Sequence, residues 1–164
     1  MPDASFVNPA WEPDRAELPG RHVARLGVAA GASELGASLF AVEPGATGSP
    51  LHAHHANEEM MLVLEGTPSL RGPRGACVLK PGDVVAFPRG DVGTHSVSNA
   101  SDHEVRYLMV STANLPDVVV YPETGATLVV LDRDALAFPN DTARPRSQVV
   151  EEAFRAAGGS PRPS

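Results

Sequence analysis

Three of the six histidines of this 164-residue chain lie side by side in the stretch SPLHAHHANEEMMLVLEG, residues 49–66. In an extended strand, side chains two positions apart point to the same face, so His52 and His54 project together while His55 faces the other way. Glu59 opens the next predicted strand and reaches the same interior if the two strands are neighbours, with Glu58 as its substitute if the register slips by one. Imidazoles and a carboxylate at such range suit a first-row transition metal. Two histidines on one strand are more often a surface coincidence, so this stretch alone leaves both interpretations open.

A second stretch, GDVVAFPRGDVGTHSVSN at residues 82–99, carries another candidate ligand. A glycine turn leads into an apolar strand, a proline turn follows, and one histidine stands at the head of a further strand. His95, Val97 and Asn99 share one face of that strand by alternation. His95 can therefore point inward and supply a further nitrogen.

Together the two stretches resemble the paired motifs of the cupin family, G-x5-H-x-H-x(3,4)-E-x6-G and G-x5-P-x-G-x2-H-x3-N. The matching residues are His52, His54, Glu59 and Gly66 in the first motif and Gly82, Pro88, Gly90, His95 and Asn99 in the second. Two places depart from the pattern: Ala46, with Gly45 beside it, stands where the first motif begins, and the longer segment 91–94 could re-aim His95. The resemblance covers roughly residues 36–122, and it is closest to the stand-alone bacterial single-domain cupins.

This resemblance implies a double-stranded β-helix, a small jelly-roll barrel with a metal held inside one end. The implied ligands of one divalent transition metal ion (Fe, Mn, Ni, Cu or Zn) are His52, His54, Glu59 and His95. On the same alternations, the candidates for a substrate pocket are Phe40, Met61, Tyr107 and Met109. Apolar residues around a polar centre are the usual form of a small-molecule site, although plain barrel core is the commoner role for the last three. His22 and His103 lie in loop-like contexts and are predicted to be solvated.

The pattern of the rest of the chain favours an all-β fold. From residue 38 onward, short apolar runs recur, each closed by Gly, Pro, Asn or Asp, which is typical of a small sandwich or barrel. We predict an N-terminal arm over residues 1–35, irregular at first and followed by a first strand or two, a barrel domain over 36–135, and an extension over 136–164. The extension holds a short amphipathic helix at 148–157 and a disordered tail. Because EMMLVLEG is apolar on both alternations, its outer face needs a cover, and we expect a homodimer.

Composition restricts the partners and the location. Thirteen Lys and Arg against twenty Asp and Glu give a net charge of −7, which argues against nucleic acid or an anionic membrane as partner. The N-terminal residues lack the basic start of a signal peptide, and no apolar run approaches the ~18 residues of a membrane span, so a cytoplasmic protein is expected. Cys77 cannot form an internal disulfide; we predict that it is a small buried hydrophobe without a catalytic part.

Three functions remain open at the level of the sequence. The first is a metal-dependent dioxygenase acting on a small organic substrate, because small single-domain cupins with the full ligand set often resemble such enzymes. The second is a metal-containing ligand-binding or sensor module without turnover. The third is a metal-dependent isomerase or lyase acting on a small acid or sugar. The fold alone cannot separate them.

Overall fold

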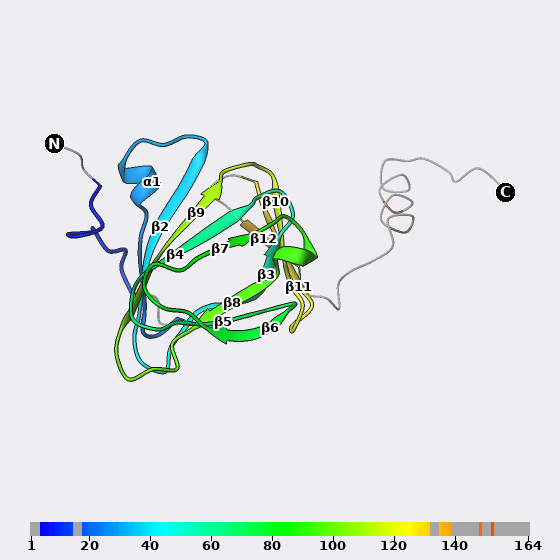
Figure 1. The fold of residues 1–164 in the computed structure, drawn as a ribbon. Coiled ribbons are helices and arrows are strands. Elements are labelled where there is room, and N and C mark those ends of the chain that lie inside the picture. The colour runs from blue at the N-terminus through cyan, green and yellow to red at the C-terminus, as the bar shows by residue number, and fades with distance from the viewer. Residues whose placement is uncertain (1–3, 15–17, 132–134, 139–147, 149–151, 153–164) are drawn as a thin grey trace, which may run out of the picture.

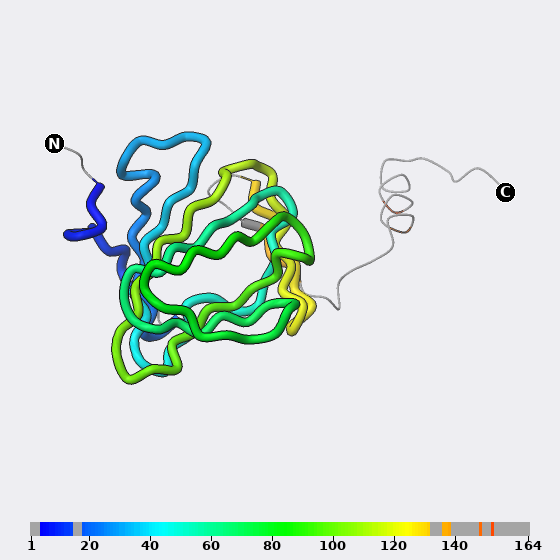
Figure 2. The backbone as a smooth tube through the Cα atoms, viewed as in Figure 1, coloured from blue at the N-terminus to red at the C-terminus, as the bar shows by residue number. Residues whose placement is uncertain are grey.

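The computed structural model describes residues 4–14, 18–131 and 135–138, together with Gln148 and Glu152. Two antiparallel sheets face one another across a common interior (Figures 1 and 2). This arrangement confirms the predicted all-β jelly roll. The predicted helix at 148–157 and the tail after it lie outside the described residues, apart from the two single positions. No described helix has the length and apolar character needed to cross a membrane.

The first sheet has the strand order β1 (Arg21–Ala24), β2 (Leu35–Val42), β9 (Val105–Thr112), β4 (Glu59–Glu65) and β7 (Val84–Phe87). The second sheet has the order β12 (Ala135–Phe138), β11 (Ala126–Val130), β10 (Asp117–Tyr121), β3 (Thr47–His54), β8 (His95–Ser98), β5 (Ser69–Gly72) and β6 (Gly75–Val78). Two short helices interrupt the strands: α1 (Leu26–Ala29) and the 3-10 helix η1 (Asp91–Gly93). Strands that follow one another in sequence therefore often lie in opposite sheets, as Figure 1 shows for β3 and β4.

The N-terminal region, predicted to be an irregular arm followed by a first strand or two, consists of two such parts. Its later part forms β1, which pairs with β2 along its whole length and extends the first sheet. Its earlier part runs beside the sheet: the Glu12 amide donates to the Val23 carbonyl at 2.8 Å, and Arg106 donates to the Phe6 carbonyl at 3.0 Å. Residues 5–14 therefore pack against the chain's own sheet.

Apolar side chains fill the space between the sheets. The buried members of this core are Val42, Met61, Val63, Leu79, Phe87, Val97, Val105, Tyr107 and Met109. Along β4 the pattern alternates: Met61 and Val63 are 0% and 1% exposed, whereas Met60 is 45% exposed. The strand that reads as apolar on both alternations is thus buried on its inner face, and its outer face is partly open in the single chain.

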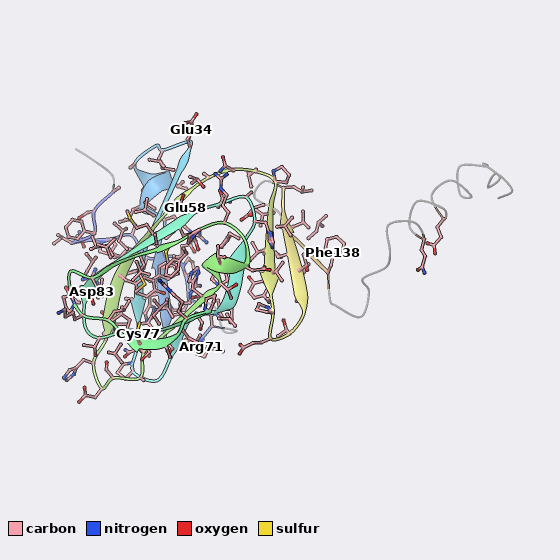
Figure 3. The ribbon with its side chains drawn as sticks, turned by 45° about the vertical axis from the view of Figure 1, so that its right-hand side comes forward. Glu34, Glu58, Arg71, Cys77, Asp83 and Phe138 are labelled. Carbon is pink, nitrogen blue, oxygen red and sulfur yellow. The ribbon has the colours of Figure 1, made fainter. Side chains whose placement is uncertain are left out.

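The prediction that Cys77 is buried is wrong. Cys77 is exposed, as are the other three residues of β6. The reason is the position of the strand: among the described strands, β6 ends the second sheet and pairs with β5 alone. Figure 3 shows Cys77 on this outlying strand, and at the opposite end of the same sheet Phe138 on β12 points away from the barrel. An apolar run of four residues does not reveal whether its strand is central or at an edge.

Candidate metal centre

The two sheets bring the four predicted ligands together. His52 on β3 stands directly opposite His95 on β8, with ring centroids 4.6 Å apart, and the His54 ring lies 5.1 Å from His52. Glu59, the first residue of β4, approaches from the other sheet: its Oε2 lies 3.6 Å from Nε2 of His54 and 3.4 Å from Nε2 of His95. One ligand atom from each of His52, His54 and Glu59 lies within 4.8 Å of the others. We call these four residues the candidate centre.

Hydrogen bonds on the far side of each imidazole define its tautomer. Nδ1 of His52 bonds to the Pro50 carbonyl at 2.8 Å, and Nδ1 of His95 bonds to the Gly93 carbonyl at 2.9 Å. Carbonyl oxygens only accept, so both rings carry their proton on Nδ1. Nδ1 of His54 likewise bonds to a carboxylate oxygen of Asp117 at 2.5 Å. A neutral ring that carries its proton on Nδ1 keeps its lone pair on Nε2, the form in which an imidazole binds a metal.

Two atoms at the middle of the candidate centre have no partner among the described residues. Oε2 of Glu59 and Nε2 of His95 are buried and make no hydrogen bond. Burial raises the pKa of Glu59 and lowers the pKa of His52, and burial lowers the pKa of His95 to about 3. A buried carboxylate and a buried lone pair without partners are costly, and a cation between them would offset that cost. The residues present therefore fit a divalent metal ion.

Asp117 was not predicted from the sequence, yet it supports this arrangement directly. It is 3% exposed and accepts hydrogen bonds from Nδ1 of His54 and from the Ala56 amide, the latter at 2.9 Å. Burial works against its ionisation, but hydrogen bonds from His54, Ala56 and Asn57 together lower its pKa. Asp117 lies 63 positions after His54 and meets it only because β10 pairs with β3, a contact with no local signal in the sequence.

The lengthened segment before His95 forms the helix η1. Gly93 and Thr94 donate their amides to Gly90 and Asp91 at 3.0 and 3.1 Å. Gly93 packs so closely that a Cβ at its position would lie 1.7 Å from the Pro88 carbonyl oxygen. The two additional residues are absorbed into this compact turn, whose Gly93 carbonyl orients the His95 ring.

The four residues predicted to line a pocket lie in or beside the barrel core. Met61, Tyr107 and Met109 are 0%, 1% and 7% exposed, and Phe40 is half-buried with its ring stacked on Tyr107 at 4.9 Å. The first three have the exposure of plain core. Phe40 is partly buried and packs against this core.

Two further polar side chains border the candidate centre and were not singled out from the sequence. Tyr121 on β10 stacks on His52 with ring centroids 5.9 Å apart. Ser111 on β9 stands opposite Glu59 on one side and Gly36 on the other. A Cβ at Gly36 would lie 2.3 Å from Oγ of Ser111, so this glycine makes room for the hydroxyl. The sequence did offer one indication of Ser111: it shares a strand face with Tyr107 and Met109 by alternation along β9.

A small cavity lies between the β5–β6 hairpin and β7 and extends to His95 of the candidate centre. Its volume is about 130 Å³, and its walls include Cys77, Val85, Phe87 and His95. Phe87 stacks on His95 with ring centroids 3.7 Å apart. The interior of the barrel is therefore bounded here by an aromatic ring and a candidate ligand.

The remaining histidines lie away from the candidate centre. His55 is exposed, as the alternation predicted, and the His103 side chain is 85% exposed. His22, predicted to be solvated, is partly exposed and lies on β1, not in a loop. Its Nδ1 lies 2.8 Å from Asp14 of the arm and its Nε2 lies 3.2 Å from Glu43, because β1 holds the ring between the arm and the β2–β3 turn.

Comparisons with known proteins agree with this geometry. Residues 38–111 match the family described as Cupin domain. A sugar phosphate isomerase from a cupin superfamily of Silicibacter pomeroyi aligns with a TM-score of 0.77 and 28% identity, covering 90% of this chain and 98% of that one. A putative sugar phosphate isomerase from Acidithiobacillus ferrooxidans aligns with a TM-score of 0.70 and 30% identity, covering 76% and 80%.

A polyketide cyclase from Streptomyces resistomycificus shares the fold, with a TM-score of 0.59 and 23% identity over 71% of this chain and 83% of that one. No curated protein matched the sequence. The paired motifs, the two facing sheets and the histidines gathered at one end of the barrel thus occur together with a direct family match. The chain belongs to the cupin superfamily.

Proposed function

We propose that this cupin is a metal-dependent enzyme that isomerises a small hydroxy-carbonyl compound of the sugar type inside the barrel. The observation that carries the proposal is the arrangement of the side chains in the candidate centre. Each of the three imidazoles makes a hydrogen bond through Nδ1, and their Nε2 sides face Glu59. Two of the converging atoms are buried without a partner among the described residues.

In this proposal His52, His54, Glu59 and His95 hold one divalent transition metal ion. Bound there, the ion would act as a Lewis acid that polarises a carbonyl or hydroxyl oxygen of the substrate. The chain's own residues set the conditions around it. Asp117 fixes the His54 ring, η1 fixes the His95 ring, and the Phe87 ring stacked on His95 forms an apolar wall beside it.

The choice of isomerisation rests on the relatives. The two solved structures with 28% and 30% identity are both described as sugar phosphate isomerases, one of them as putative. Ring opening and proton transfer next to a carbonyl need a polarised oxygen and positioned polar groups, which the candidate centre and its neighbours Ser111 and Tyr121 could supply.

A dioxygenase acting on a small organic substrate is the second candidate. It is favoured by the ligand types, since imidazoles with one carboxylate also suit iron, copper, nickel and manganese. The two candidates differ in a measurable way: a dioxygenase consumes molecular oxygen, whereas an isomerase exchanges a carbon-bound proton with solvent. A binding or sensor module would hold the metal and do neither.

The first experiment measures metal content by elemental analysis of the purified full chain and two matched variants. His54→Ala should remove most of the metal, whereas His55→Ala, which changes the exposed neighbour, should retain it. Oxygen uptake and solvent-deuterium incorporation into sugar phosphates are then followed by electrode and by NMR. Loss of metal in His55→Ala with retention in His54→Ala would overturn the ligand assignment.

A further inference from the structure

One row of residues crosses the interior face of the first sheet at the level of the candidate centre. Ser111 on β9 stands opposite Gly36 on β2 on one side and opposite Glu59 on β4 on the other. Glu59 in turn stands opposite Phe87 on β7, so the row runs across neighbouring strands of the sheet (Figure 1). Directly opposed residues point to the same face of a sheet. Because Ser111 lies two positions after Met109, a member of the buried core, the row faces the interior.

The two ends of this row enclose the candidate centre differently. At the β7 end, Phe87 is 6% exposed and its ring stacks on His95. At the β2 end, Gly36 has no side chain, and Ser111 beside it is half-buried. Within this row, a ligand next to Glu59 therefore has room on the side of β9 and β2, because the Phe87 ring closes the other side.

The backbone of β2 gives no reason for a glycine at position 36. The two strands β2 and β9 pair in unbroken register from Leu35 to Val42, which excludes a bulge, and the φ angle of Gly36 is not positive. A glycine inside a strand weakens the strand and often marks a place where another group approaches closely. A Cβ built at Gly36 would collide with Oγ of Ser111. The glycine therefore keeps a place on the interior face for the serine hydroxyl.

The Ser111 hydroxyl makes no hydrogen bond to any residue that the structure describes. The hydroxyl of the next residue, Thr112, differs: it donates to Oδ1 of Asn57 at 3.0 Å and accepts from the Glu58 amide at 3.2 Å. A serine hydroxyl offers one donor and two acceptor lone pairs. On Thr112 the hydroxyl stabilises the fold, whereas on Ser111 it is available to a ligand.

We infer that Ser111 binds a hydroxyl group of the ligand, and that the ligand is an α-hydroxy aldehyde or ketone, whose hydroxyl lies on the carbon next to the carbonyl. The inference rests on the proposed function for the position of the carbonyl oxygen at the candidate centre. With that oxygen beside Glu59, the hydroxyl of the neighbouring carbon takes the open side of the row, where Ser111 stands. An analogue without this hydroxyl leaves the half-buried serine hydroxyl unpaired, which costs affinity.

The inference is tested by isothermal titration of the full chain, with its metal as purified, using ribose 5-phosphate and 2-deoxyribose 5-phosphate as probes. The two sugars differ by the hydroxyl next to the carbonyl carbon and carry the same phosphate, so the affinity of phosphate for a metal ion cancels in the comparison. The wild type should bind ribose 5-phosphate about three- to tenfold more tightly, the effect of one neutral hydrogen bond. Ser111→Ala should abolish this preference. Ser98→Ala, which removes a hydroxyl from the face of β8 opposite to that of His95, should keep it.

Gly36→Ala tests the same contact from the neighbouring strand. Its methyl group would displace the Ser111 hydroxyl, so the preference for ribose 5-phosphate should fall. In a chain that already carries Ser111→Ala the collision is absent, and Gly36→Ala should then have no further effect on the preference. Such non-additivity identifies a direct interaction between the two positions, which a general loss of stability would not produce.

Metal content is measured for every variant, because loss of the metal would weaken the binding of both sugars alike. The inference is overturned by a preference that survives in Ser111→Ala, by equal weakening of both sugars in a variant with full metal, or by no binding of ribose 5-phosphate to the wild type. The proposed function fails separately. A wild type whose sugar preference depends on Ser111, but which incorporates no solvent deuterium into the sugar, binds the ligand as inferred and does not isomerise it.

Discussion

At the scale of single residues, the orientation of the His54 ring depends on Asp117, which accepts the hydrogen bond from its Nδ1. His52, His54, Glu59 and His95 are close in sequence or belong to paired motifs, and strand alternation places them on interior faces. Asp117 is neither close in sequence to these residues nor part of the paired motifs. Its contact with His54 depends on the pairing of β10 with β3, which sequence spacing does not encode.

Replacing Asp117 by Asn should lower metal affinity by about 10–100-fold, the usual cost of losing a partner behind a ligating histidine. The amide keeps the shape of the carboxylate but loses its charge, and the pKa of Asp117 is held low by the hydrogen bond from His54. Competition with a chelator of known affinity measures the change. Asp102→Asn, at a side chain that is 89% exposed, is the matched control; an equal effect of both variants would contradict the role of Asp117.

At the scale of elements, the turn that precedes β8 determines where the His95 ring lies. The longer segment before His95 could have displaced that ring, and sequence comparison alone could not decide this. The structure shows it folded into η1, with Gly93 buried against Pro88. Whether an insertion alters a site depends on how it packs, which a motif does not record.

Gly93→Ala should therefore destabilise the fold by about 1–3 kcal/mol, the usual cost of forcing extra volume into a packed site. Its added methyl would collide with the Pro88 carbonyl, and the shift of η1 should also reduce metal content. Chemical unfolding and elemental analysis measure the two effects. Val92→Ala, at a position of the same helix that is 73% exposed, should show neither; a stable Gly93→Ala with full metal would mean that η1 does not position His95.

The N-terminal arm is attached through His22 in a pH-dependent way. Hydrogen bonds to Glu43 and Asp14 raise the pKa of His22 above 6.5, so the protonated ring favours the attached arm. This contribution is fully present below the unfolded-state pKa of 6.5 and is lost as the pH rises through the higher folded-state pKa.

Trp11, the only tryptophan, lies with its ring 6.3 Å from His22 and reports on this attachment. Its fluorescence should change as the pH is raised from about 6 through the folded-state pKa of His22. His22→Gln should abolish that change and His103→Gln should keep it. A titration that is identical in His22→Gln would assign the pH response to another group.

At the scale of the whole molecule, the jelly roll follows from many short strands closed by turn residues, and this much was predictable. What the local pattern could not supply is the place of each strand in its sheet. Cys77 was predicted to be buried because its strand is apolar, but β6 ends the second sheet. EMMLVLEG was predicted to be covered on both faces; within the described part of the chain its inner face is buried and its outer face is partly open.

We expect the open outer face of the first sheet to be covered by a second copy of the chain. Met60 lies opposite Val110 on one side and Ala86 on the other, and Val84 nearby is 57% exposed. An apolar sheet face of this kind is typical of an interface. Light scattering should give the mass of a dimer for the wild type and of a monomer for Met60→Glu.

Val78→Glu, at a position of β6 that is 67% exposed, is the control and should stay dimeric. A monomeric wild type at micromolar concentration would leave the outer face to the arm or the C-terminal extension. A monomer produced by Val78→Glu but not by Met60→Glu would place the interface on the second sheet.

The exposed position of Cys77 gives the protein a natural attachment point for a spectroscopic probe. The chain has one cysteine, and it lies on the wall of the same small cavity as His95. A thiol-reactive fluorophore or nitroxide label would therefore attach at one position, on the wall of that cavity, without prior mutagenesis. Quenching or paramagnetic broadening of such a label would follow the arrival of ions and small molecules in the barrel in real time.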